Sequence, residues 1–111
     1  MLVLTTTTVP DQRIVKTLGA VYGLSVRSRS ETGNMLGKLR SFAGGSMGGY
    51  EKLVRQARED AVTGMIREAE SLGANAVIGF RFDGSSMGAG DKESFIEVTA
   101  YGTAVIIEAN P

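Results

Sequence analysis

Hydrophobic and polar positions alternate with a period of two over residues 13–29, near the amino terminus. Alternation of this kind is typical of a strand that has one side buried. The even-numbered side of the segment is the more apolar, and it carries Ile14, Leu18, Ala20, Tyr22, Leu24 and Val26. We therefore expect a long strand with its even-numbered side toward the core, preceded by a short strand over residues 2–5.

The middle of the chain changes to a period of three to four. Apolar residues recur at this spacing over residues 50–72 and form a single stripe, which predicts a long helix that stops before Gly73. A shorter apolar pattern over residues 33–42 follows Thr32, whose hydroxyl suits a helix cap, and predicts a second, short helix. Residues 44–49 are rich in glycine and separate the two helices.

The period of two returns in the last third of the chain, over residues 76–83 and 94–109. We expect two strands joined as a hairpin by a flexible, glycine-rich loop at residues 84–91. The apolar side of the first of these strands consists of Ala76, Ile78, Phe80 and Phe82.

The predicted order is thus ββααββ, within a single domain over residues 1–111. Runs of strands separated from helices are typical of an α+β fold. We expect a mostly antiparallel sheet that is covered on one face by one short and one long helix. The two longest strands, of about 16 residues each, far exceed the usual length. Because one helical layer cannot cover both faces of such a sheet, we expect the chain to form a homo-oligomer.

Composition narrows the chemistry that this fold can carry. The 111 residues include 12 Lys and Arg and 12 Asp and Glu, and a formal net charge of zero argues against a nucleic-acid partner. The absence of Cys and His excludes disulfides, zinc fingers, thiol catalysis and the commonest general base. No apolar run reaches the length of a membrane span, and the amino terminus lacks a signal-peptide pattern. A cytoplasmic protein that is not an enzyme is the expectation.

The glycine-rich segment before the long helix is the candidate anion site. Successive glycines allow backbone N–H groups to converge, and a helix amino terminus adds partial positive charge. The Gly-Lys-Ser/Thr sequence of a P-loop is missing, however, so a simple connector between two helices is the competing interpretation. The candidate anion-binding residues are Gly45, Ser46, Gly48 and Gly49.

Candidate metal ligands are few. Thioethers suit soft ions such as Cu(I), and carboxylates suit hard cations. The residues of these types in the two glycine-rich loops are Met47, Met87, Asp91 and Glu93. The competing interpretation gives the methionines packing roles. No cofactor is predicted, and the absence of Cys and His disfavours a metal ion.

Three short stretches carry a family resemblance: GYE at residues 49–51, LGANAVIG at residues 72–79 and AYGTAV at residues 100–105. In this order, and over nearly the whole chain, the sequence resembles the YbjQ-like family of small bacterial and archaeal proteins, also called UPF0145. The resemblance implies an α+β fold, a ring-shaped homopentamer and the label "putative heavy-metal-binding domain". The family has no established enzymatic activity, so no catalytic residue is implied. Without Cys and His, this chain departs from the label.

Three hypotheses on function stay open at this point. The first is a homo-oligomeric, pentameric binding or scaffold domain that takes a small ligand or ion. The second is a structural or protein-interaction ring without a small ligand. The third is a small-molecule site at the subunit junctions, for an anion or for an enzymatic substrate held by Arg, Asp and Tyr side chains.

Overall fold

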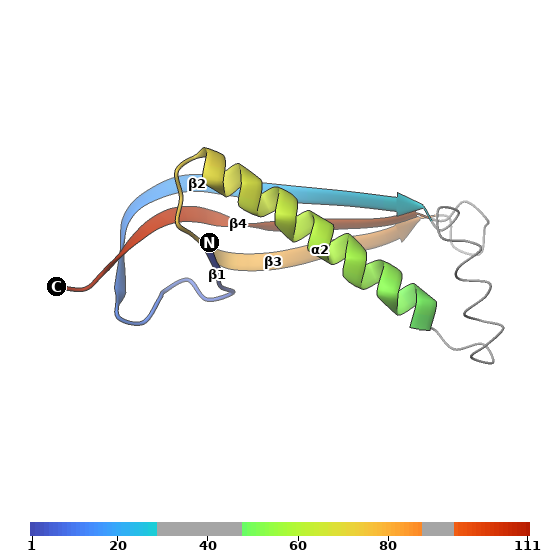
Figure 1. The fold of residues 1–111 in the computed structure, drawn as a ribbon, viewed down its shortest axis with the longest axis horizontal. Coiled ribbons are helices and arrows are strands. Elements are labelled where there is room, and N and C mark those ends of the chain that lie inside the picture. Colours follow the sequence, from blue (N-terminus) through green and yellow to red (C-terminus); the bar gives the residue numbers. More distant parts are fainter. Residues whose placement is uncertain (29–47, 88–94) are drawn as a thin grey trace.

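The computed structural model describes residues 1–28, 48–87 and 95–111 (Figure 1). Along the chain, the described elements are strand β1, strand β2, helix α2, strand β3 and strand β4. Their bounds are Leu2–Val3, Gln12–Ser28, Gly48–Ser71, Ala76–Met87 and Phe95–Ala109. The short helix predicted for residues 33–42 lies outside the described residues. The expected α+β class is confirmed.

The four strands form one mixed sheet in the order β1-β3-β4-β2. β4 pairs antiparallel with both β2 and β3, while β1 pairs parallel with β3. Tyr101 of β4 lies between Tyr22 of β2 and Arg81 of β3 in this register. The sheet is therefore mostly antiparallel, as predicted, and β2 is a long edge strand.

Helix α2 lies diagonally across one face of the sheet (Figure 1). Its apolar stripe contacts the sheet as the periodicity predicted, because Ala57, Ala61, Met65 and Ala69 are fully buried. The main core lies between this stripe and the strand residues Val21, Val77, Ile96, Val98, Ala100 and Ala104. A smaller cluster of Ala76, Ile78 and Val105 is separate from this core and packs with Val9 and Ile107.

Small residues set the closest contact between helix and sheet. A Cβ atom added to Gly23 would lie 1.7 Å from the carbonyl oxygen of Ala61 and 2.4 Å from the backbone nitrogen of Met65. One turn along the helix, Gly64 faces the same strand residue, and a Cβ there would lie 3.4 Å from the Cα of Gly23. The helix backbone therefore rests directly on β2 at Gly23.

At this contact, the buried side of β2 is the opposite of the expected one. Val21, Gly23 and Ser25 on the odd-numbered side are buried under α2. The even-numbered residues Tyr22, Leu24 and Val26 remain 57%, 61% and 55% exposed. The prediction was wrong for this part of β2 because a register shift between Thr17 and Gly19 inserts one residue. The even-numbered Leu18 still packs against the core, whereas the odd-numbered residues face α2 from Val21 onward.

Two details of the hairpin also differ from the sequence prediction. β3 continues through Gly84 to Met87, residues expected in the loop, because β4 pairs with them from Val98 to Phe95. A bulge interrupts β3 between Ile78 and Arg81, where Gly79 has a φ of 62°. The extra residue changes the alternation, so Ile78 belongs to the small cluster while Phe80 packs against the main core.

Candidate functional site

The candidate anion site is only partly described. Gly48 and Gly49 are the first residues of α2 itself, not part of a preceding loop, and Gly49 is buried. Gly45 and Ser46 lie outside the described residues. The anion site therefore remains a prediction from the sequence, and the structure corrects only the point at which the helix begins.

Only one of the four candidate metal ligands lies within the described residues, so the predicted metal site stays a prediction. Met87 is the last residue of β3, opposite Phe95 in the register. Met47, Asp91 and Glu93 lie outside the described residues. Within residues 1–28, 48–87 and 95–111, no three acidic side chains gather in a group that could hold a metal ion. Met87 is thus the single predicted ligand that the structure places.

The face of the sheet opposite α2 carries exposed apolar side chains on β2 and β4, and we call it the open face. Residues directly opposite in the register share a side of the sheet, which puts Tyr22 beside Tyr101 and Leu24 beside Thr99. Arg81 and Asp83 of β3 and Glu97 of β4 add charge to the same face. The apolar members of the open face are Tyr22, Leu24, Val26, Phe95 and Tyr101, each at least 39% exposed.

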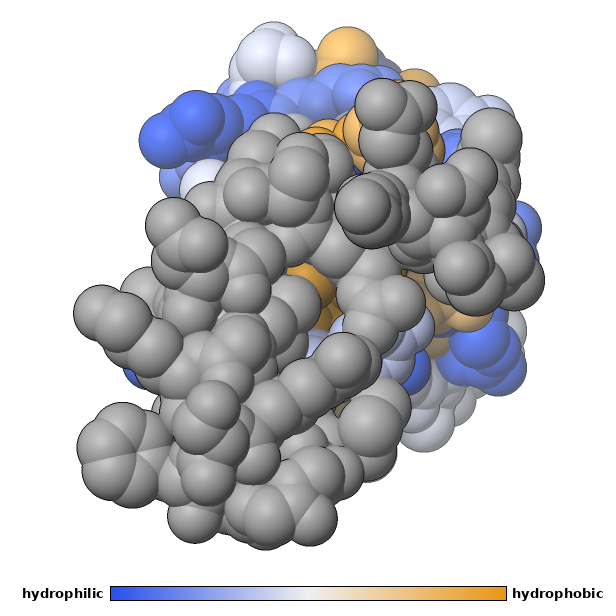
Figure 2. All heavy atoms as spheres, turned by 90° about the vertical axis from the view of Figure 1, so that its right-hand side faces the viewer, coloured by the Kyte–Doolittle hydropathy of each residue, from blue (hydrophilic) through white to orange (hydrophobic). Residues whose placement is uncertain are grey.

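Hydrophobic atoms also reach the surface at the end of the molecule where β2, β3 and β4 finish their shared register. Figure 2 views this end and shows them among the hydrophilic atoms of the described residues. No helix within the described ranges has the length and apolar character needed to cross a membrane. The apolar members of the open face are thus exposed among the described residues, whereas farther along the same side of β4 Val105 is buried beside Val9 and Ile107.

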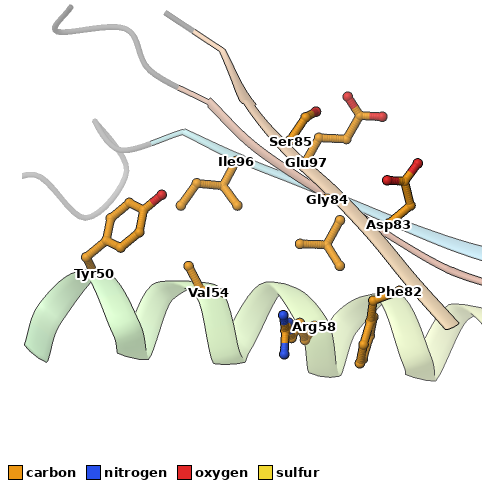
Figure 3. Close-up of a pocket in the computed structure, with 10 residues that line it drawn as sticks. Tyr50, Val54, Arg58, Phe82, Asp83, Gly84, Ser85, Ile96 and Glu97 are labelled. Carbon is orange, nitrogen blue, oxygen red and sulfur yellow. The ribbon is translucent and has the colours of Figure 1, made fainter. Parts of the chain in front are cut away.

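A cleft of about 340 Å³ opens on the other face, between the amino-terminal half of α2 and the sheet. We call it the helix–sheet cleft (Figure 3). The helix contributes Tyr50, Val54 and Arg58 at intervals of four residues, so the three share one side of α2. The strands contribute Phe82, Asp83, Gly84, Ser85, Ile96, Glu97 and Val98.

The cleft has an apolar floor, but polar groups make up more than half of its exposed lining. Ile96 and Val98 are 4% exposed, and the guanidinium carbon of Arg58 lies 4.9 Å from the centroid of the Phe82 ring. The carboxylates of Asp83 and Glu97 point away from the helix (Figure 3), in keeping with their place on the open face. The cleft thus offers a hydrophobic floor with a single guanidinium at its wall.

Sequence analysis missed this site. Arg58 and Phe82 stood in ordinary helix and strand patterns, and Gly84 was assigned to the loop. The available signal was the glycine itself, because a glycine in a strand can mark a place where a ligand or another backbone approaches closely. Recognising that signal required knowing that β3 extends past residue 83.

The LGANAVIG stretch builds a turn. Gly73 has a φ of 85°, the left-handed conformation that commonly ends a helix. The Asn75 side chain donates from Nδ2 to the carbonyl oxygen of Ile107 over 2.9 Å and accepts at Oδ1 from the Ile107 N–H over 2.8 Å. The Asn75 side chain therefore extends the hydrogen bonding between β3 and β4 by one residue. The LGANAVIG stretch thus has a structural role.

Comparisons with known proteins agree with this architecture. The YbjQ_1 family model, described as "Putative heavy-metal-binding", matches residues 1–108. A UPF0145 protein of Acidiphilium cryptum is 51% identical over 109 residues, which cover 98% of this chain and 96% of that protein. A UPF0145 protein of Picrophilus torridus is 45% identical over 108 residues, covering 97% of this chain and 88% of that protein.

A solved structure shares the fold. It is a Pediococcus pentosaceus protein of unknown function from the DUF74 family, with a TM-score of 0.59 at 19% sequence identity. The alignment covers 97% of this chain and 98% of that one. By its match to the family model and to these relatives, the chain belongs to the YbjQ-like UPF0145 family.

Proposed function

We propose that this protein is a homo-oligomeric binding or scaffold domain, and not an enzyme, whose copies associate through the open face. The observation that carries the proposal is the exposure of Tyr22, Leu24 and Val26, each more than half exposed on one strand. Burial of such side chains contributes about 1.5–3 kcal/mol each, so leaving them in water forgoes a large stabilisation. A second copy of the chain is the occupant that we propose.

The dimensions of the elements support self-association. A helix of 24 residues spans about 36 Å, whereas a strand of 17 residues reaches about 55 Å. One helix cannot cover such a sheet, and among the described strands β2 also presents an unpaired edge. The homopentameric ring is the closed assembly that the family resemblance implies, and we adopt it as part of the proposal. A cytoplasmic location and the absence of nucleic-acid and membrane partners belong to the same proposal.

The heavy-metal description does not fit the donors of this chain. Thiolates and imidazoles build tight sites for Zn²⁺, Cu²⁺ and Ni²⁺, and the sequence contains neither. The described residues supply no acidic cluster in their place. We expect equilibrium dialysis of untagged protein, followed by elemental analysis, to find no tight binding of these three ions. A submicromolar dissociation constant for any of them would restore the family description for this member.

The assembly is tested by light scattering of the purified protein and of two matched variants. A pentamer of 11.7 kDa chains has a mass of about 58 kDa. Leu24→Lys places a charge on the open face and should reduce the mass toward that of one chain. Leu72→Lys is the control, since Leu72 is 45% exposed at the end of α2 and should leave the mass unchanged. A wild-type mass near 12 kDa at micromolar concentration would refute self-association.

A further inference from the structure

We infer that the helix–sheet cleft binds a small molecule that combines a flat apolar body with one carboxylate group. The inference names a ligand class for the binding role proposed above, on which it rests. It does not depend on the number of copies in the assembly. The supporting observations are a missing side chain in the floor of the cleft, the apolar floor formed by Ile96 and Val98, and the placement of Arg58.

The cleft exists because the floor lacks a side chain at Gly84. Gly84 lies opposite Val98 in the register and shares its helix-facing side, between Phe82 and the end of the strand. A Cβ added at Gly84 would come no closer than 3.5 Å to another group, the carbonyl oxygen of Glu97. A larger residue could therefore stand here and fill the space. Glycine instead leaves a strand position without packing, at a cost in conformational entropy.

The space left by Gly84 is shaped for an apolar group. Val98, opposite Gly84 in the register, and Ile96 belong to its floor. Val54 lies on the helix side, and Tyr50 and Phe82 place aromatic rings at the two ends (Figure 3). At about 340 Å³, the cleft is at the lower limit of the volumes typical of ligand pockets. It suits a single ring or a branched aliphatic chain.

Arg58 supplies the polar contact. A guanidinium stacked on an aromatic ring keeps its N–H groups at its edge, where they can bind both oxygens of a carboxylate. Two other arginines of this surface already have acidic partners, since Arg27 pairs with Asp60 and Arg55 with Glu51. Arg58 has no carboxylate partner among the described residues, and its neighbours Asp83 and Glu97 point away from it (Figure 3). Arg58 is therefore the lining group that can bind an anion.

The test is NMR spectroscopy of methyl-labelled protein that is titrated in solution with three small molecules. Phenylacetate combines a ring with a carboxylate, phenylacetamide is its neutral analogue, and acetate lacks the ring. Phenylacetate should shift the methyl resonances of Val54, Ile96 and Val98 with a dissociation constant of about 1 mM, as expected for so small a ligand. The methyls of Val21 and Val77, which are buried outside the cleft, should not move. Phenylacetamide and acetate should bind at least about tenfold more weakly.

Two variants assign the binding to the cleft. Arg58→Gln should weaken phenylacetate at least about tenfold, because a charge-assisted hydrogen bond is lost. Gly84→Leu should abolish binding by filling the cleft. Arg67→Gln, an exposed arginine elsewhere on α2, is the matched control and should bind as the wild type does. Melting temperatures close to that of the wild type confirm that each variant is folded.

Three results would overturn the inference. They are no shift at the cleft methyls up to about 20 mM phenylacetate, equal affinity for phenylacetamide, or unchanged affinity in Arg58→Gln. A cleft filled by another copy of the chain would give the first result. Light scattering on the same samples measures the mass of the assembly independently of ligand binding. If a monomer binds phenylacetate, the proposed assembly is refuted and the ligand site is supported. If a pentamer forms but does not bind phenylacetate, the assembly is supported and the ligand site is refuted.

Discussion

Two glycines of the sheet face α2, but the helix packs tightly against one of them and leaves space beside the other. At Gly23 the helix backbone is so close that an added Cβ would lie 1.7 Å from the carbonyl oxygen of Ala61. At Gly84 the nearest group to an added Cβ is 3.5 Å away, and a cleft separates the strand from the helix. Close packing therefore requires a glycine at position 23, whereas at position 84 there is space for a larger side chain.

The difference follows from the residues on the helix. Ala61 and Gly64 have little or no side chain, so the helix can rest on β2 and fix its distance from the sheet. Toward the amino terminus of α2, Tyr50 and Val54 are larger and face the cleft. The middle of the helix therefore rests on β2, while its first turns pack on the sheet through larger side chains that also line the cleft.

Breaking the tight contact has the largest expected effect. Gly23→Ala forces the helix away from the strand, because the added Cβ meets backbone atoms that no side-chain rotation can move aside. We expect a loss of about 3 kcal/mol or more in the free energy of unfolding. Chemical denaturation at one fixed protein concentration measures it, since unfolding of an oligomer depends on concentration. A loss below about 0.5 kcal/mol would show that the contact is not tight.

The same substitution at the second glycine should act in the opposite direction. Gly84→Ala meets no group closer than 3.5 Å and reduces the freedom of the unfolded chain. We expect a gain of about 0.5–1 kcal/mol in the free energy of unfolding, measured beside Gly23→Ala under identical conditions. A clear destabilisation would mean that the cleft is closed in solution.

The smallest expected effect concerns an ion pair beside the tight contact. Arg27 of β2 donates from Nε to Asp60 of α2 over 3.1 Å, and the two side chains are 24% and 46% exposed. A double-mutant cycle with Arg27→Gln and Asp60→Asn should give a coupling of about 0.5–1 kcal/mol that falls with added salt. Arg13 and Glu108, at 3.6 Å and more than half exposed, provide the control pair with a weaker coupling. Equal coupling in both pairs would assign no special role to the Arg27–Asp60 contact.

Much of the architecture could be predicted from local patterns. The stripe of Ala57, Ala61, Met65 and Ala69 predicted the long helix and its buried side, and Gly73 marked its end. These predictions succeeded because a helix pattern and its stop depend on neighbours within one or two turns. The candidate site could not be predicted in this way, since Arg58, Phe82 and Gly84 come from three places that only the fold brings together.

The sequence by itself determined the α+β class, the order of the described strands and helix, and the absence of thiolate and imidazole ligands. The tertiary structure decided which side of β2 is buried, because alternation defines two sides of a strand but not the one that a helix meets. The register shift between Thr17 and Gly19 changed the side that faces α2, and Gly23 lets the helix backbone approach there while Leu24 stays exposed. The bulge at Gly79 likewise moved Ile78 away from Phe80, since one extra residue changes the side of every residue after it.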